Sequence, residues 1–401
     1  NGLTSLVTDF QNAFNDLKEY QGQLEDWIFG YFSYDLKNDV EQLTSENYDG
    51  LHFPDLYFFQ PKKIIRIAGN TVDFVYLNMV DDEIEGDFEE ITEIGPLGMD
   101  QVGQGYDQIQ ASDGAQTLVG NSTSNDIRIK LRTSKDDYFS RIKALLAHIH
   151  RGDIYEANFC QEFYAENTTI DVLKAFDKLN AISKAPFAAF LKIRDKFLMS
   201  ASPERYLRKK SGIAISQPIK GTAKRSPDLE TDAALKFNLQ KDAKERSENI
   251  MIVDLVRNDL SKSAVKGSVR VPELCEVHSF AQVHQLISTV TAEVPKDKNP
   301  VEIIEETFPM GSMTGAPKIS AMRIIEAQED FKRGLYSGAV GYFTPDGDFD
   351  FNVVIRSILY NASEKYVSFA VGGAITAKSV PKKEYEECLL KAKAMREVLE
   401  E

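Results

Sequence analysis

Two pairs of glutamates stand three residues apart in segments with helical patterning. Glu245 and Glu248 form the first pair, and Glu384 and Glu387 form the second. Side chains at positions i and i+3 share one face of a helix, where like charges repel each other unless a cation lies between them. Four carboxylates from two helices suit Mg²⁺, a hard cation that prefers oxygen ligands. The alternative for either pair alone is a solvated acidic face, because acidic helices are common.

A second arrangement brings an acid and an amine together. Ser202-Pro-Glu-Arg is followed by Pro218-Ile-Lys-Gly-Thr, and the residues between them read as a hairpin that turns at Ser211-Gly212. Partners across such a hairpin have numbers that sum to about 423, so we expect Glu204 and Lys220 nearly opposite each other at its open end. There an acid can protonate a leaving group while an amine attacks carbon. The alternative is an exposed cross-strand ion pair.

Two glycine-containing segments offer sites for an anionic ligand. Pro309-Met-Gly-Ser-Met-Thr-Gly-Ala-Pro-Lys318 leads into a helix whose first turn contains Pro317. The free N–H groups and the positive dipole end of such a helix attract anions. Val371-Gly-Gly-Ala allows the backbone to approach a ligand closely, because glycine has no side chain. The alternatives are an ordinary loop with a good helix start and an ordinary turn.

Hydrophobic periodicity predicts the elements that position these residues. Helices are expected over 8–20, 136–152, 242–256, from 317 onward and from 381 to the C-terminus. Strands are expected at 27–32, 63–68, 187–193, 197–200, 206–208 and 213–216. The acidic run over 81–90 reads as a solvated face. Strands interrupted by long helices predict a mixed α+β fold.

The order of these segments predicts three parts. Residues 1–95 form an N-terminal region, residues 96–130 an exposed connection, and residues 131–401 the core with the candidate site. The connection is predicted from its richness in Gly, Gln, Ser, Asp and Asn, which is typical of exposed loops.

Composition excludes several classes of partner. The formal net charge of −15 disfavours nucleic acid and anionic membrane surfaces. It also means that an anionic substrate needs a local positive site. The three cysteines are widely spaced, which fits a reducing cytoplasm better than a disulfide framework. No apolar run is long enough to span a bilayer, so no membrane partner is expected.

Taken together and in order, these segments resemble the chorismate-binding enzyme family. The stretches that carry the resemblance are Gly152-Asp-Ile-Tyr, Ser202-Pro-Glu-Arg, Pro218-Ile-Lys-Gly-Thr, Asp254-Leu-Val-Arg-Asn-Asp-Leu, Val283-His-Gln-Leu-Ile-Ser, Gly315-Ala-Pro-Lys, Gly338-Ala-Val-Gly-Tyr-Phe, Ile355-Arg-Ser and Glu384-Tyr-Glu-Glu. They lie within residues 136–397, and the segment from Trp27 to Asp35 looks like the family's N-terminal region. The resemblance implies the fold of anthranilate synthase component I, an α/β/β/α arrangement of two packed sheets with outer helices.

The resemblance also implies a role for each matching residue. Glu248 and Glu387 would contact Mg²⁺, and Glu245 and Glu384 would hold the waters of the metal. Beside the metal, the ring carboxylate of the substrate would meet Gly221 and Thr222. The enolpyruvyl carboxylate would be held by three residues, namely Tyr336, Arg356 and the backbone of Gly372. His284 and Ser312 would line the ring.

Position 220 favours one branch of the family. A lysine in Pro-Ile-Lys-Gly-Thr is typical of aminodeoxychorismate synthases, whereas anthranilate synthases usually have alanine there. The resemblance implies that Lys220 attacks C2 of chorismate while Glu204 protonates the departing C4 hydroxyl. Ammonia then attacks C4 and releases the lysine, which gives 4-amino-4-deoxychorismate for p-aminobenzoate and folate synthesis. Because only a neutral lysine attacks, we expect burial to lower the pKa of Lys220.

Other branches and roles stay open. Anthranilate synthase is the nearest alternative, followed by isochorismate and salicylate synthases, whose general-base lysine corresponds to Glu156. Aminating members usually have glutamine there, and often a third glycine where this chain has Ala374. A binding protein without activity is disfavoured because the glutamates, Glu204 and Lys220 are all present. No cysteine lies in a Gly-x-Cys-x-Gly turn, so ammonia is expected from a separate glutamine amidotransferase subunit.

Overall fold

A computed structural model of the chain describes residues 2–9, 11–41, 43–93, 127–280 and 283–400. The chain divides into two compact units, one of Asn1–Ser5 with Phe59–Asp126 and one of Leu6–Phe58 with Ile127–Glu401. Residues 6–58 therefore belong to the unit that carries the candidate site, whereas the sequence predicted a division near residue 95. Most of the predicted connection over 96–130 lies outside the described residues.

The smaller unit contains a hairpin and a helix. Strands β4 (Lys63–Ala68) and β5 (Thr71–Tyr76) pair antiparallel, and η2 (Asp81–Glu83) leads into α3 (Ile84–Glu93). The acidic run over 81–90 has no buried residue, which fits the predicted solvated face. Lys63 binds both Glu83 and Asp87 at 2.6 Å and thereby joins the acidic segment to the hairpin. Strand β1 (Gly2–Thr8) also begins in this unit.

The larger unit contains two sheets. In the first, the strands follow the order β3-β2-β16-β17-β10-β11-β14-β12, and β13 also pairs with β14. The strands are β2 (Ile28–Phe32), β3 (Leu56–Pro61), β10 (Arg205–Lys210), β11 (Ile213–Gln217), β12 (Ile219–Lys224), β13 (Arg270–Ser279), β14 (Val283–Glu293), β16 (Ala339–Phe343) and β17 (Phe349–Val353). This sheet carries Lys220 on β12 and Glu204 immediately before β10.

The second sheet has the order β15-β7-β19-β18-β9-β8, with β6 paired to β7. Its strands are β6 (Lys130–Leu131), β7 (Glu156–Ala165), β8 (Phe187–Ile193), β9 (Lys196–Ser202), β15 (Gly315–Ala316), β18 (Ser357–Asn361) and β19 (Tyr366–Thr376). Strands β7 and β19 pair without interruption from Val367↔Ala165 to Thr376↔Glu156. The long ladder fixes Gly372 and Glu156 within one rigid surface.

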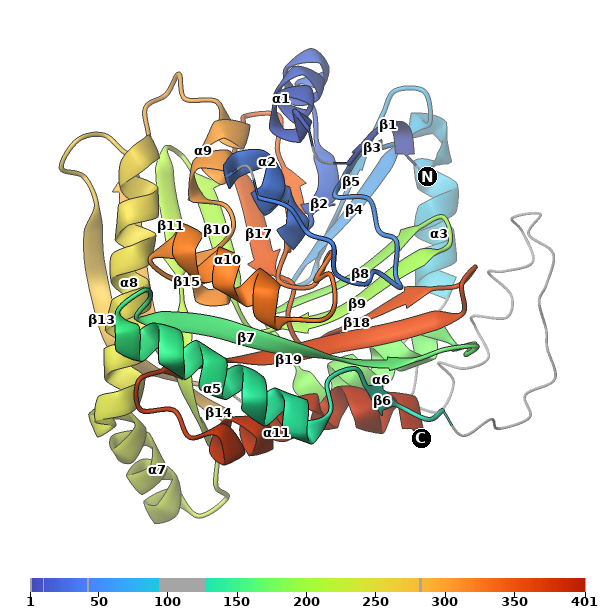
Figure 1. Cartoon of the computed structure of the whole chain (residues 1–401). Coiled ribbons are helices and arrows are strands. Elements are labelled where there is room, and N and C mark those ends of the chain that lie inside the picture. Colours follow the sequence, from blue (N-terminus) through green and yellow to red (C-terminus); the bar gives the residue numbers. More distant parts are fainter. Residues whose placement is uncertain (1, 10, 42, 94–126, 281–282, 401) are drawn as a thin grey trace. The chain divides into compact units, whose positions relative to one another are not determined.

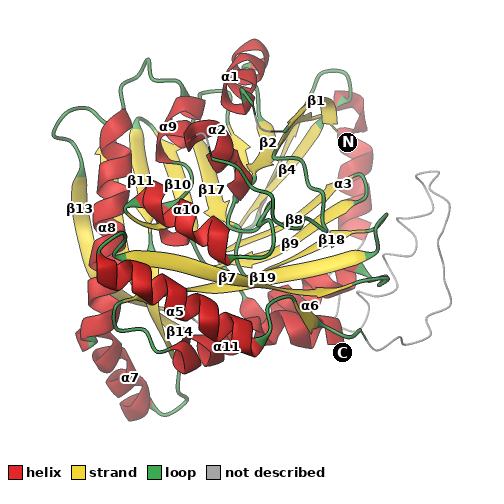
Figure 2. Cartoon of the chain, viewed as in Figure 1, coloured by secondary structure: helices red, strands yellow, loops and turns green. Residues whose placement is uncertain are grey.

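The two sheets share one apolar core and helices lie outside them (Figure 2). Core residues of the second sheet, such as Leu198 and Ala370, join Phe32 and Phe351 of the first. Helices α6 (Val172–Ser183) and α11 (Pro381–Glu400) pack on the outer face of the second sheet, and α5 (Lys135–Arg151) and α10 (Lys318–Gln328) cover β7 and β19 (Figure 1). The remaining helical segments of this unit are α1 (Ala13–Leu24), η1 (Tyr34–Leu36), α2 (Lys37–Glu41), α7 (Leu229–Lys241), α8 (Ala243–Ser263), α9 (Pro300–Thr307) and η3 (Gly311–Met313). The predicted α/β/β/α fold is confirmed.

Most predicted elements form at the predicted places. Helix α8, for example, begins directly after Asp242, whose carboxylate accepts the backbone N–H groups of Lys244 and Glu245. Two other helices start at residues that differ from the prediction. The first helix was predicted from residue 8, but it begins at Ala13. Residues 2–8 form a strand instead, and Asn12 has a left-handed φ of 69° that a helix does not allow. Pro317 caps α10 rather than occupying its first turn.

The hairpin of β10 and β11 has the predicted turn. Ser211 and Gly212 both have positive φ, at 51° and 79°, as a type I′ turn requires. Lys209 pairs with Ala214, which confirms the predicted sum of 423. None of the helices in the described ranges is long and apolar enough to cross a membrane.

Strand β15 is packed closely against β7 and α10, and a substitution at Gly315 can test this packing. A Cβ on Gly315 would overlap the carbonyl oxygen of Glu156 and lie 2.8 Å from Cβ of Ala321. Gly315→Ala should therefore lower the free energy of unfolding by roughly 1–3 kcal/mol, the usual cost of overpacking. Gly22→Ala in α1 is the control, because a Cβ there meets nothing within 4 Å and alanine favours helices. Denaturant unfolding measures both variants, and a Gly315→Ala protein as stable as wild type would contradict the close packing.

Candidate active site

The structure brings Glu204 and Lys220 together at the open end of the hairpin. Each side chain contributes electrostatically to the pKa of the other. The backbone N–H of Val353 binds the carbonyl of Glu204 at 3.0 Å, and Ile219 beside Lys220 pairs with Ile287 of β14. Both residues therefore belong to one sheet, where β17 binds the backbone of Glu204 and β14 pairs with the strand of Lys220.

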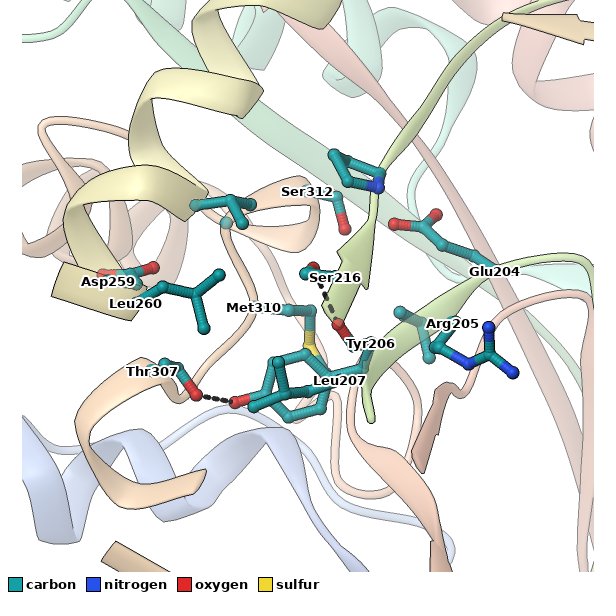
Figure 3. A pocket seen from close by; sticks show the side chains of 14 residues that line it. Glu204, Arg205, Tyr206, Leu207, Ser216, Asp259, Leu260, Thr307, Met310 and Ser312 are labelled. Atoms are coloured by element: carbon teal, nitrogen blue, oxygen red, sulfur yellow. Dashed lines mark hydrogen bonds between the residues drawn. The ribbon is translucent and has the colours of Figure 1, made fainter. Parts of the chain in front are cut away.

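Burial changes the protonation of Glu204. Removal from water raises its pKa to about 7, although a hydrogen bond with Ser312 and the charge of Lys220 oppose the rise. Glu204 and Ser312 line one pocket (Figure 3). A carboxyl group with this pKa is partly protonated at neutral pH, so it can donate a proton to a leaving group.

The pKa of Lys220 is shifted in the direction opposite to the one expected from the sequence. Burial by itself lowers the pKa of this amine, but the charges of Glu156, Glu248 and Glu204 outweigh burial and raise the pKa above its ordinary value. The closest of these carboxylates is Glu156, whose Oε1 lies 3.4 Å from Nζ of Lys220. The expectation of a lowered pKa is therefore wrong for the protein without ligands, because three carboxylates surround the amine.

The four glutamates expected to bind metal lie on α8 and α11. Lys244 lies among these glutamates. Its Nζ is 3.7 Å from Oε1 of Glu248 and 4.0 Å from Oε1 of Glu384. Glu245 and Glu387 also raise the pKa of this lysine, although burial opposes them. Within the described ranges, no three His, Cys, Asp or Glu side chains are close enough together to hold a metal. In this state the positive charge between the two helices is an ammonium group.

The acidic side chains are not equivalent. Burial raises the pKa of Glu248 to about 7, against the charges of Lys220 and Lys244. Its Oε1 is buried and has no hydrogen-bond partner. Burial acts in the same direction on Glu387, but Lys391, 2.8 Å away, outweighs it and lowers the pKa. Glu248 therefore combines a raised pKa with a buried oxygen that has no hydrogen-bond partner and lies 3.7 Å from the ammonium of Lys244.

A second group of positive charges lies near α11. Lys391 donates to the carbonyl of Gly372 at 2.8 Å, and Arg356 donates to the carbonyl of Lys391 at 3.1 Å. Burial lowers the pKa of Arg356, although the nearby Tyr336 and Glu387 oppose this. The hydroxyl of Tyr336 contacts Sγ of Cys160 at 3.6 Å. The structure thus gathers the three residues predicted to hold the enolpyruvyl carboxylate, Tyr336, Arg356 and Gly372.

Gly221 lies beside the acidic group. Its φ of 85° is in the left-handed region, and a Cβ would come within 3.0 Å of Oε2 of Glu245. Only glycine meets both conditions without strain. The adjacent Thr222 pairs with Gln285 of β14. The positions of Gly221 and Thr222 fit a binding surface beside the predicted metal site.

Two side chains hold the ring of His284. Its Nδ1 lies 2.8 Å from Oγ of Ser279, and its Nε2 lies 3.1 Å from Oδ1 of Asp232 on α7. Both ring nitrogens are therefore engaged, and the place of His284 beside the ring of the substrate stays a prediction. Directly paired residues share a face of the sheet, so Gln285 shares the face of Thr222, whereas His284 shares the face of its partner Ala223.

Sequence reasoning missed the lysines that compensate the acidic groups. Lys244 stands four residues before Glu248, and Lys391 four residues after Glu387, which are helical contact spacings. That spacing was a usable signal. The contact between Glu156 and Lys220 was not readable, because it joins residues 64 positions apart on different sheets. Ala374 pairs with Asn158 inside the β7–β19 ladder, so the missing third glycine leaves that ladder intact.

Comparisons with known proteins test the family resemblance. A family model described as chorismate binding enzyme matches residues 4–397. The chain is 36% identical over 408 residues to a probable chloroplastic aminodeoxychorismate synthase of Oryza sativa subsp. japonica, covering 96% of this chain and 45% of the relative. It is 38% identical to aminodeoxychorismate synthase component 1 of Escherichia coli (strain K12), covering 67% of this chain and 58% of the relative. The chain thus spans about half the length of these curated relatives.

Two further comparisons cover most of the chain. Anthranilate synthase component 1 of Acetivibrio thermocellus is 30% identical, over 93% of this chain and 74% of the relative. The crystal structure of anthranilate synthase component I from Streptococcus pneumoniae TIGR4 superposes with a TM-score of 0.79 at 23% identity, covering 99% of this chain and 90% of that one. The second comparison shows the fold.

The raised pKa of Glu204 predicts a pH-dependent stability. Its folded pKa of about 7 lies above the ordinary value of 4.5, so its contribution is fully present below pH 4.5 and is lost as pH rises through 7. Relative to Glu204→Gln, the wild type should lose roughly 3 kcal/mol of unfolding free energy between pH 5 and pH 8. Urea unfolding at both pH values, without metal, measures this. The exposed Glu364→Gln should show the wild-type dependence, and the same dependence in Glu204→Gln would contradict the shift.

Proposed function

Because the chain belongs to the family of chorismate binding enzymes, we propose that it aminates chorismate to 4-amino-4-deoxychorismate, a step toward p-aminobenzoate and folate. The observation that carries the proposal is the buried pair of Glu204 and Lys220. An amine and a partly protonated carboxyl group at one place suit covalent catalysis with general-acid assistance. Relatives named aminodeoxychorismate synthase support the same branch.

In the proposed mechanism Lys220, whose raised pKa keeps it protonated without a ligand, first gives one proton to solvent, and its neutral amine then attacks C2 of chorismate. Glu204 gives its proton to the C4 hydroxyl, which leaves as water, and Ser312 holds the carboxyl group of Glu204 in place. Both ring double bonds shift during this step, from C1–C2 to C1–C6 and from C5–C6 to C4–C5, so that the substrate becomes attached to Lys220. Ammonia then attacks C4, and the lysine leaves with its electron pair. The amine therefore arrives para to the ring carboxylate.

The substrate carries two carboxylates, and the site offers a place for each. Arg356 and Tyr336, with the backbone of Gly372, form a positive and hydrogen-bonding surface for the enolpyruvyl carboxylate. Gly221 and Thr222 offer backbone and hydroxyl groups to the ring carboxylate. Because the net charge of the chain is −15, these local groups must overcome a repelling field.

Magnesium is part of the proposal. Glu248 and Glu387 would hold the ion directly, and Glu245 and Glu384 would hold its waters. Two observations fit this: Oε1 of Glu248 is buried without a hydrogen-bond partner, and the ammonium of Lys244 lies among the carboxylates as an internal cation. When bound, Mg²⁺ would neutralise the ring carboxylate.

Ammonia is proposed to come from a separate glutamine amidotransferase subunit. The component 1 names of the bacterial relatives imply a partner component in those proteins. A cytoplasmic location stays a prediction.

The product test separates this function from anthranilate synthesis. With chorismate, Mg²⁺ and ammonium, chromatography should show 4-amino-4-deoxychorismate, and added lyase should convert it to p-aminobenzoate. Lys220→Ala should lower the rate of amination by roughly 10²–10⁴-fold, because covalent catalysis is lost. Lys224→Ala, at the exposed end of the same strand, is the control and should keep the wild-type rate. Anthranilate as the main product would overturn the proposal.

Calorimetric titration of Mg²⁺ tests the metal site. Glu248→Gln should weaken binding at least about tenfold, because a charged oxygen ligand is lost. Lys244→Met should tighten binding, because the internal cation no longer competes for the carboxylates. Lys236→Met, at an exposed position of α7, controls for the loss of one positive charge. Unchanged affinity in both site variants would place the metal elsewhere.

A further inference from the structure

Glu156 is a buried carboxylate at the reacting centre to which the proposed mechanism gives no role. It begins β7, where its backbone is held between Ala316 of β15 and Thr376 of β19. Its side chain is about 1% exposed. Oε1 lies 3.4 Å from Nζ of Lys220, and Oε2 is buried without a hydrogen-bond partner. One oxygen therefore faces the nucleophile and the other has an unmet hydrogen-bonding capacity.

An unpartnered buried oxygen is unusual. Buried polar atoms are nearly always hydrogen-bonded, and leaving one unmet costs about 1–3 kcal/mol, more when the group is charged. The cost is not relieved by movement of the strand, because pairing on both sides fixes the backbone of Glu156. The geometry therefore points to a hydrogen-bond donor that enters during the reaction.

The chemistry of the reactants narrows the choice of donor. The two substrate carboxylates are anions, so they are repelled from a second carboxylate. The C4 hydroxyl leaves with the proton of Glu204, which is held by Ser312 in the η3 segment. Lys220 already directs its N–H toward Oε1. The remaining reactant is ammonia, which carries N–H donors and has no charge.

We propose that Oε2 of Glu156 accepts an N–H of the attacking ammonia and takes the proton that this nitrogen loses. The inference rests on the proposed function. The lone pair of ammonia forms the C4–N bond, both ring double bonds shift back, and the C2–Nζ bond breaks. Lys220 leaves from its protonated secondary form as a neutral amine. The excess proton on the new C4–N group passes to Glu156, which becomes a carboxylic acid, so charge and atoms balance.

The experiment separates discharge of the lysine adduct from its formation. Adduct is first formed with chorismate and Mg²⁺ without ammonia, then mixed with ammonium chloride, quenched at intervals and followed by intact-protein mass spectrometry. Glu156→Gln should form the adduct as wild type does, because Gln retains an oxygen for Lys220. Its discharge by ammonium should be at least about 100-fold slower, the lower value for a positioned proton acceptor.

Two further variants serve as controls for the effect of Glu156→Gln. Glu166→Gln removes the same charge just beyond the far end of β7, where Glu166 binds the exposed Lys130, and should discharge at the wild-type rate. Glu156→Asp retains a carboxylate but withdraws it, so discharge should be intermediate. If Glu156→Gln does not fold, the Asp variant alone decides, with slowed discharge of a normally formed adduct as the expected result.

Three outcomes would overturn the inference. Wild-type discharge in Glu156→Gln would show that no proton passes to this residue. Failure of this variant to form the adduct would assign Glu156 to the attack by Lys220, and loss of Mg²⁺ binding in calorimetry would make Glu156 a metal ligand. A wild-type protein that forms neither adduct nor aminated product would instead reject the proposed function, and the inference with it. Measurement of the wild-type protein thus distinguishes failure of the inference about Glu156 from failure of the proposed function.

Discussion

The structure depends on a buried amine that is surrounded by carboxylates. Lys220 belongs to the first sheet and Glu156 to the second, so their contact spans the place where the two sheets meet. Burying one ion without its partners costs several kcal/mol, and here the charges of Glu204 and Glu248 supply the compensation that burial demands. The elements around Lys220 must therefore hold three acidic side chains in register. The surroundings of Lys220 are therefore assembled from strands of both sheets and from helix α8.

Local rules made much of the fold predictable. The two-residue turn at Ser211-Gly212 set the register of the β10–β11 ladder as far as Arg208, beyond which a bulge shifts the pairing. Lys220 lies beyond this ladder on β12, which pairs with β14, so the turn accounts for its approach to Glu204 only in part. Helix starts at capping residues such as Asp242 were likewise readable. The grouping of residues 6–58 with the site-bearing unit was not, since the pairing of β2 with β16 joins residues about 310 positions apart and leaves no local signal.

Side-chain direction limited the prediction of the site. His284 and Gln285 are adjacent in sequence, but β14 turns them to opposite faces, and only the pairing with β12 shows which face meets Thr222. Charge compensation was the second limit. The sequence shows the glutamates of α8 and α11 as acidic pairs, while the pKa of Lys220 depends on a carboxylate from a distant strand. Spacing identifies residues that share a face, whereas the net electrostatic effect requires the complete surroundings.

The site has an acidic group on one side and a positive charge on the other, and the charges on both sides are only partly compensated. On one side, the unpartnered oxygen of Glu248 lies in an acidic group that an internal lysine compensates only partly, at 3.7 Å. On the other side, Arg356 is buried and its pKa is lowered, so its charged form is under-stabilised. A guanidinium remains protonated at neutral pH, and a carboxylate beside it would restore the lost stabilisation through charge-assisted hydrogen bonds. A ligand with two carboxylates, one shared with a cation at the acidic group and one at Arg356, relieves both imbalances at once. A neutral aromatic ligand would relieve neither imbalance, so these electrostatics fit the dianionic substrate that we propose.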